Sequence, residues 1–207
     1  MRTRSLEHTG TYHTVSRMLA MIVSADGTRA LVNENEDLGG GGGFVIDART
    51  AQKLAAIPTA SMVRTTLLAD NSIATISLTP SNEGWLNVYA PDGTPRYRMA
   101  LGSAQNFYLS RELTGGRLTA VASNWKPGTP ITAMGAATTY VIDYVNGRVV
   151  QRAEGLGAVV RGWQQWYSAD PRHDVSDAER PLAAYGKDAL YSWQPLTGEK
   201  KLLLASR

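Results

Sequence analysis

The chain contains no cysteine among its 207 residues. This absence excludes disulfide frameworks, cysteine-ligated zinc, iron–sulfur clusters and thiol catalysis together. Histidine is scarce, with three copies, and no Gly-x-Ser-x-Gly elbow marks a nucleophilic serine. No motif in the sequence therefore identifies a catalytic chemistry.

Long apolar runs are also missing. The apolar run at residues 18–23 follows a polar stretch and is too short for the core of a secretion signal or for a membrane span. We therefore predict no membrane partner. The default compartment is the cytoplasm, unless the chain is a fragment of a secreted protein.

Charged residues of both signs are distributed along the chain without long runs. Lys and Arg total 21 against 18 Asp and Glu, a formal net charge of +3, and no run of like charge is longer than Lys200-Lys201. A nucleic-acid footprint would be clustered, so we predict no nucleic-acid partner. With 43% hydrophobic and 19% charged residues, the composition suits an ordinary globular protein.

The sequence does contain a short motif that occurs four times. Each copy is a short apolar or aromatic strand followed by a tight turn with Asp or Asn, Gly, Pro or Thr. The copies begin at Phe44, Leu86, Tyr140 and Leu190. A unit that recurs about every 40 to 55 residues, too small to bury its own face, indicates stacked repeats.

The residues around these motifs also favour strands. Asp26-Gly27 lies between two apolar runs, as in a β-hairpin, and residues 73–78 alternate in polarity. Helical periodicity is weak, and its best segments, residues 15–22 and 177–185, are short. We therefore expect an all-β chain with little helix.

Residues 193–199, Trp-Gln-Pro-Leu-Thr-Gly-Glu, are similar to the Asp-x-x-Thr-Gly turns of quinoprotein-type repeats. Residues 47–52 form a weaker copy in which Ala51 replaces the glycine. Four consecutive meanders of this kind resemble the blades of a β-propeller, WD40-like or quinoprotein-like. The resemblance covers residues 20–207. It implies a β-propeller-like array of about four four-stranded antiparallel blades that pack face to face.

Two departures from the pattern bear on cofactors. The tryptophan that follows such turns in quinoprotein repeats is absent, with Leu54 and Leu202 in that region. No Gly-His and Trp-Asp pair typical of WD40 blades occurs either. A quinone cofactor is therefore disfavoured, and we predict no cofactor apart from a candidate divalent cation.

The domain boundaries follow from where the repeats begin. We expect residues 1–18 to form a poorly ordered N-terminal extension and residues 19–207 to form one β-propeller-like domain. About 45 residues per blade gives only four to five blades, fewer than most propellers have. The wheel is then either compact or partial. A partial wheel leaves open edges that favour self-association.

An acidic loop is the first candidate site. Glu34, Glu36 and Asp37 offer several oxygen ligands within a few residues, as calcium or another hard cation requires. Their spacing matches no defined metal loop. The competing interpretation is a solvated loop beside the glycine run at residues 39–43.

A polar insertion is the second candidate site. Aromatic rings beside carboxylates are typical of sugar sites, and a helical spacing would bring the polar residues to one face. The competing interpretation is that the tryptophans fill blade packing and the Asp residues solvate a loop. The residues are Trp163, Trp166, Tyr167, Asp170, His173 and Asp174.

Three functions remain open, and the leading one is a non-catalytic binding or interaction module. It would use loops such as residues 34–43 and 164–181 on one rim of a rigid scaffold to bind a protein or glycan partner. The alternatives are a hydrolase or lyase with its site at residues 163–181, and a fragment of a larger propeller. We favour a protein that is not an enzyme.

Overall fold

The computed structural model describes residues 18–34, 43–58, 64–124, 137–158, 175–186 and 189–205. All of the regular elements in these ranges are β-strands. Residues 18–23 and 182–185, which overlap the two weakly helical segments of the sequence, are strands as well. No helix that could cross a membrane occurs within these described ranges.

The strands form four antiparallel sheets, which we call blades 1 to 4 in chain order. Blade 1 contains β1 (Met18–Val23), β2 (Arg29–Glu34), β3 (Gly43–Asp47) and β4 (Lys53–Ile57). Blade 2 contains β5 (Thr65–Leu67), β6 (Ile73–Leu78), β7 (Glu83–Tyr89) and β8 (Pro95–Ser103). Blade 3 contains β9 (Asn106–Leu113), β10 (Arg117–Ser123), β11 (Thr138–Asp143) and β12 (Arg148–Glu154). Blade 4 contains β13 (Gly157–Ala158), β15 (Leu182–Tyr185), β16 (Ala189–Trp193) and β17 (Lys200–Ala205).

Each blade is a simple meander in which consecutive strands pair as neighbours. The motif that recurs in the sequence forms the third strand of each blade and the turn that follows it. These third strands are β3, β7, β11 and β16. Blade 3 departs from the expected four strands because β14 (Val175–Ser176) pairs in parallel with β9 and adds a fifth. The prediction of an all-β array of four antiparallel blades is confirmed.

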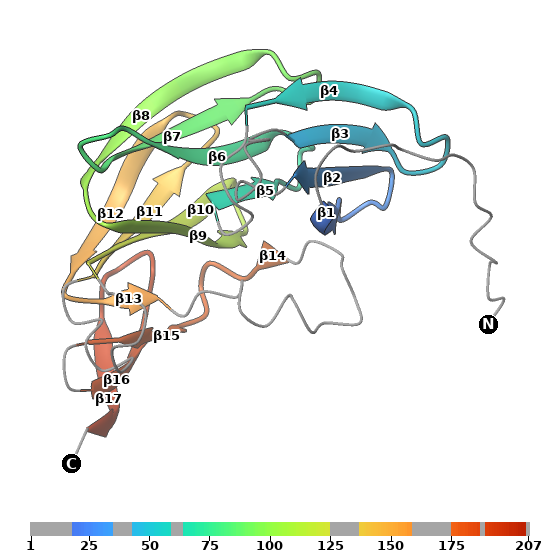
Figure 1. The fold of residues 1–207 in the computed structure, drawn as a ribbon. Helices are drawn as coiled ribbons and strands as arrows, with labels where there is room; N and C mark the ends of the chain where they lie inside the picture. Colours follow the sequence, from blue (N-terminus) through green and yellow to red (C-terminus); the bar gives the residue numbers. More distant parts are fainter. Residues whose placement is uncertain are drawn as a thin grey trace, which may run out of the picture.

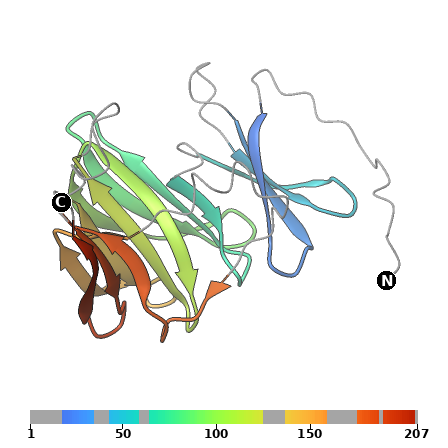
Figure 2. The same cartoon turned by 90° about the horizontal axis from the view of Figure 1, so that it is seen from below.

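The blades lie in an open arc (Figure 1). The first strand of each blade faces the concave side and the last strand faces the convex side, as in the blades of a propeller. Blades 1 and 4 lie at opposite ends of the arc, which Figure 2 shows from below. The chain therefore forms a partial wheel.

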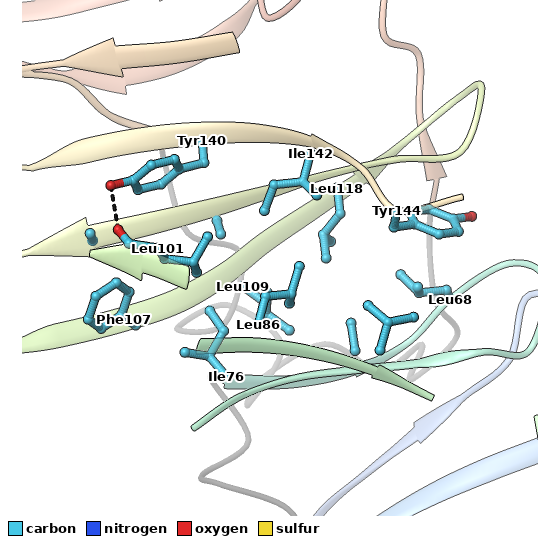
Figure 3. Close-up of a cluster of buried hydrophobic side chains, with 14 of the residues drawn as sticks. Leu68, Ile76, Leu86, Leu101, Phe107, Leu109, Leu118, Tyr140, Ile142 and Tyr144 are labelled. Carbon is cyan, nitrogen blue, oxygen red and sulfur yellow. Dashed lines mark hydrogen bonds between the residues drawn. The ribbon is translucent and has the colours of Figure 1, made fainter. Parts of the chain in front are cut away.

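The hydrophobic core is divided into three layers, one between each pair of successive blades. The layer between blades 1 and 2 includes Ile22, Leu31, Val45, Leu67 and Ile73. The layer between blades 3 and 4 includes Leu113, Val121, Val141, Ala184 and Trp193. The layer between blades 2 and 3, drawn in Figure 3, includes Ile76, Leu86, Phe107, Leu118, Tyr140 and Ile142.

The layer between blades 2 and 3 is closely fitted around Phe107. Its ring is fully buried, and a Cβ atom added at Gly84 of β7 would lie 2.4 Å from the ring's Cζ. Nearby, the Tyr140 hydroxyl of blade 3 donates a 2.6 Å hydrogen bond to the Leu101 carbonyl of blade 2 (Figure 3). Gly84 therefore gives the Phe107 ring the space it needs to pack against blade 2.

We expect Gly84→Ala to destabilise the protein by about 1–3 kcal/mol, because the added methyl group overpacks a rigid interface. Denaturant unfolding measures this loss. Phe107→Leu replaces the ring with a smaller side chain and makes room for the added methyl group. The double variant should therefore lose less free energy of unfolding than the sum of the losses of the two single variants. Additive losses would show that Gly84 and Phe107 do not compete for space.

Candidate functional site

The residues that the sequence proposed as ligands lie outside the described residues. For Glu34, only its backbone at the end of β2 is described. The predicted cation and sugar sites thus remain predictions. The undescribed members are Glu36, Asp37, Trp163, Trp166, Tyr167, Asp170, His173 and Asp174.

The structure nevertheless fixes where the two predicted loops attach. Residues 35–42 join β2 to β3, whereas residues 159–174 lie between β13, the first strand of blade 4, and β14. β14 pairs with the end of β9, and the Ala178 amide donates a 2.9 Å hydrogen bond to the Thr114 hydroxyl in the β9–β10 turn. The C-terminal end of the insertion therefore lies at the rim opposite the β2–β3 connection. The expectation of one shared rim is wrong, because strands alternate in direction within each blade.

One rim of the arc is formed by the connections after the first and third strands of each blade, which are tight turns except for residues 159–181 after β13, and we call it the tight-turn rim. An Asp closes several of these turns by accepting backbone hydrogen bonds. Asp47 accepts from the amides of Arg49 and Thr50 at 2.9 and 2.7 Å, and Asp143 accepts from Asn146 at 3.0 Å. Asp47 and Asp143 therefore stabilise the turns in which they lie.

These hydrogen bonds also alter the acidity of the rim. Hydrogen bonds from Ser24 and Thr28 hold the pKa of Asp26 well below its usual range. Those from Thr50, Thr94 and Asn146 lower the pKa of Asp47, Asp92 and Asp143 in the same way. Each carboxylate is thus stabilised in its charged form by the folded turn.

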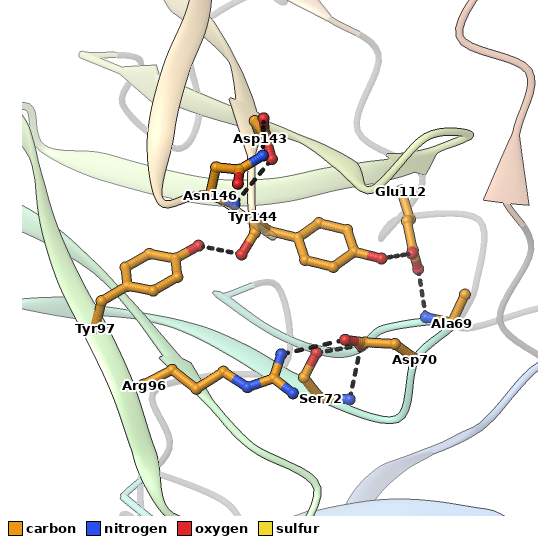
Figure 4. A network of polar contacts seen from close by, with 9 residues as sticks. All are labelled: Ala69, Asp70, Ser72, Arg96, Tyr97, Glu112, Asp143, Tyr144 and Asn146. Carbon is orange, nitrogen blue, oxygen red and sulfur yellow. Dashed lines mark hydrogen bonds and ion pairs between the residues drawn. The ribbon is translucent and has the colours of Figure 1, made fainter.

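A buried carboxylate joins blades 2 and 3 at this rim. Glu112 of β9 is 1% exposed. It accepts a 2.5 Å hydrogen bond from the Tyr144 hydroxyl of blade 3 and a 2.8 Å bond from the Ala69 amide of blade 2 (Figure 4). Burial, and then the hydrogen bond to Glu112, raise the pKa of the Tyr144 phenol far above its usual range. Tyr144 therefore keeps the proton that it donates.

A second tyrosine extends this contact between the blades. The Tyr97 hydroxyl of β8 donates a 2.8 Å hydrogen bond to the Tyr144 carbonyl (Figure 4), and burial, followed by the Asp143 charge, raises the pKa of Tyr97 to about 12. Arg96 beside it forms a 3.2 Å ion pair with Asp70. Arg98 stacks over the Trp85 ring at 4.1 Å. These residues have structural partners within blades 2 and 3.

Sequence reasoning missed this network. Residues 107–113, Phe-Tyr-Leu-Ser-Arg-Glu-Leu, contain three polar residues in a row, and nothing in this pattern marks Glu112 as the buried one. Its partners Ala69 and Tyr144 lie 43 and 32 residues away in the chain. Among the described residues, no group of three or more His, Cys, Asp or Glu side chains could hold a metal ion.

The outermost strand of blade 4 exposes large apolar side chains. Leu202, Leu203 and Leu204 of β17 are 54, 54 and 66% exposed. Scattered exposed leucines are ordinary, but three successive ones on an edge strand are not. β17 therefore exposes an apolar surface of the kind that usually contacts a partner.

Comparison with known proteins shows the fold. No family model matches the chain, and no curated protein matches it. Among solved structures it is similar to the dihydro-heme d1 dehydrogenase NirN, with a TM-score of 0.59 and 15% identity over 93% of this chain and 38% of that one. It is also similar to the propeller domain of the Trilobed protease from Pyrococcus furiosus, described as having an open velcro topology, with a TM-score of 0.55 and 9% identity over 90% and 57% of the two chains.

The fold is that of a β-propeller. A third similar structure, the WD40 domain of Toxoplasma gondii coronin, has a TM-score of 0.52 and 11% identity over 97% of this chain and 49% of that one. The chain thus spans 38 to 57% of the length of these three structures. The resemblance to propeller blades that the sequence suggested is confirmed for the fold, and at these identities for the fold alone.

We expect Tyr144→Phe to destabilise the protein by about 1–3 kcal/mol, because it leaves the buried Glu112 carboxylate short of a donor. The matched control is Tyr89→Phe, since the Tyr89 hydroxyl has no hydrogen bond within the described structure. This control should change the free energy of unfolding by less than about 0.5 kcal/mol. Equal effects of the two substitutions in denaturant unfolding would contradict a special role for Glu112.

We also expect stability to fall as the pH drops below about 4. The folded pKa values of Asp26, Asp47, Asp92 and Asp143 lie below the ordinary 3.8. Their contribution is therefore fully present above that value and is lost as the pH falls through the folded values. Unfolding midpoints measured along a pH series test this.

Asp143→Asn should flatten that acid limb of the stability profile, because it removes one titrating turn. The control is Glu83→Gln, whose exposed carboxylate accepts no hydrogen bond within the described residues. An acid limb that Asp143→Asn leaves as steep as in the unchanged protein would show that the turn does not contribute.

Proposed function

We propose that the chain is a non-catalytic interaction module. It binds a protein partner through the rim opposite the tight-turn rim, which we call the long-loop rim. The observation that supports this is the difference between the two rims. Seven of the eight connections on the tight-turn rim are turns of three to six residues, the exception being residues 159–181 between β13 and β15, whereas the long-loop rim carries connections of very different length.

The connections of the long-loop rim follow the second and fourth strands of each blade. Residues 104–105 join β8 to β9 and residues 79–82 join β6 to β7, but residues 124–137 join β10 to β11 and residues 35–42 join β2 to β3. Long loops on a rigid scaffold are the usual location of binding residues. The acidic residues Glu36 and Asp37 belong to this rim by sequence.

The scaffold beneath these loops supports such a role. Three apolar layers and the Glu112 network hold the blades together, so loops attached to neighbouring blades are held at defined separations. A partner that contacts loops of blades 1 and 3 would therefore meet a preorganised surface, which lowers the entropic cost of binding.

Substitutions in the two long loops test the proposal. We expect Glu36→Ser with Asp37→Ser, and separately Trp125→Ala with Lys126→Ala, each to remove partners that the unchanged protein retains in quantitative pull-down experiments. The control is Arg49→Ser, an exposed residue on the tight-turn rim, which should leave the profile unchanged.

Profiles that stay the same for both loop variants would contradict the proposal. A glycan array run in parallel distinguishes the class of partner. Loss of glycan signals with unchanged protein capture would identify a glycan-binding rim and overturn the choice of a protein partner.

A further inference from the structure

Each internal blade buries two faces. We call the face that is turned toward the next blade in sequence the forward face, and the opposite one the rear face. The forward face of blade 2 carries Ala74, Ile76, Leu86 and Val88, all fully buried against blade 3. The forward face of blade 3 carries Leu113, Val121 and Val141, all fully buried against blade 4. Forward faces in this chain are thus apolar and covered.

The forward face of blade 4 has an apolar end and lies at the end of the arc. Strand register places Tyr185 beside Leu190 and Leu190 beside Leu204, so these three side chains share one face, whose other end carries Ala183, Ser192 and Lys201. Trp193 and Ala184 point to the other face, where they are fully buried against blade 3. Leu204 is 66% exposed, and Tyr185 and Leu190 are only partly buried.

The rear face of blade 1, at the other end of the arc, is apolar as well. Register places Met21 beside Val32 and Val23 beside Ala30, on the side opposite the buried Ile22 and Leu31 that contact blade 2. Ala30 and Val32 are buried on this face, whereas Met21 is 42% exposed and Val23 is partly exposed. The rear faces of blades 3 and 4, with Phe107 and Trp193, are apolar in the same way.

We propose that a second copy of this chain completes the wheel. The forward face of blade 4 in one copy packs on the rear face of blade 1 in the other, and a twofold axis generates the second, identical contact. Both contacts continue the packing that already joins blades 1 to 2, 2 to 3 and 3 to 4. Such a head-to-tail contact forms a closed ring when the rotation between the copies closes.

The size of the arc fits two copies. The chain covers 49% of the coronin WD40 domain and 57% of the Trilobed protease propeller domain in superposition. A four-blade arc thus amounts to about half of a closed propeller of ordinary size. One further copy supplies the missing half, and it also covers the exposed Leu204 and Met21 without requiring any new kind of contact.

Light scattering coupled to gel filtration tests this with the full chain over a dilution series. We expect a particle of twice the 22.4 kDa chain mass. Leu204→Asp places a charge in the forward face and should halve the measured mass. The matched control is Leu202→Asp, because Leu202 is 54% exposed on the same strand but pairs with Tyr191, on the face turned toward blade 3. This control should leave the mass doubled.

A second substitution at the other end makes the result independent of β17. Met21→Asp, in the rear face of blade 1, should halve the mass as Leu204→Asp does. Circular dichroism and a cooperative thermal transition confirm that each variant is folded.

Three outcomes would overturn the proposal. A chain of single mass at every concentration would show that no second copy covers the open faces. A double mass that survives both Leu204→Asp and Met21→Asp would place the contact elsewhere. Growth into larger assemblies would show that the contact does not close. The mass readout does not depend on any rim ligand, so it is decided separately from the interaction module proposed above.

Discussion

Face-to-face packing of sheets is the constraint on which this structure depends. Each blade is a meander of short strands with apolar side chains on both faces, and a single sheet of this kind cannot bury both faces alone. Stacking solves this for blades 2 and 3, which are covered on both sides. The two end blades must also bury their apolar side chains, which accounts for the apolar residues on their outward faces.

Polar contacts at the tight-turn rim determine how the blades align. The apolar layers attract the blades to one another, but hydrophobic contact by itself has little directional preference. Hydrogen bonds to the buried Glu112 and from Tyr97 to the Tyr144 carbonyl have defined geometry, and they connect turns of blades 2 and 3. Between blades 1 and 2, Arg29 donates a 2.8 Å bond to the Pro91 carbonyl in the same manner.

The sequence predicted the strands that alternate in polarity or flank an Asp-Gly turn well, including β1, and predicted the shortest first strands poorly. Strands such as β6 and β7 alternate visibly and are followed by turn residues, Thr-Pro-Ser-Asn after β6 and Ala-Pro-Asp-Gly after β7, which are local signals. The first strands β5 and β13 are only three and two residues long, so they carry no periodicity. They are strands because the neighbouring strands β6 and β15 offer them backbone partners.

The candidate site was harder to predict for a related reason. The turn carboxylates Asp47 and Asp143 could be assigned from local pattern, because their partners lie within three residues. The role of Glu112 could not, since its partners belong to a different turn and a different blade. The two rims likewise follow from strand direction within the blades, which a linear sequence does not display.

We infer that successive blades share their stability through common apolar layers. Hydrogen exchange measured by mass spectrometry in the unchanged protein and in Phe107→Ala tests it most directly, because Phe107 belongs to blade 3 but packs on blade 2. We expect faster exchange in β6 and β7 of blade 2 as well as in β10 and β11 of blade 3. Faster exchange confined to blade 3 would contradict it.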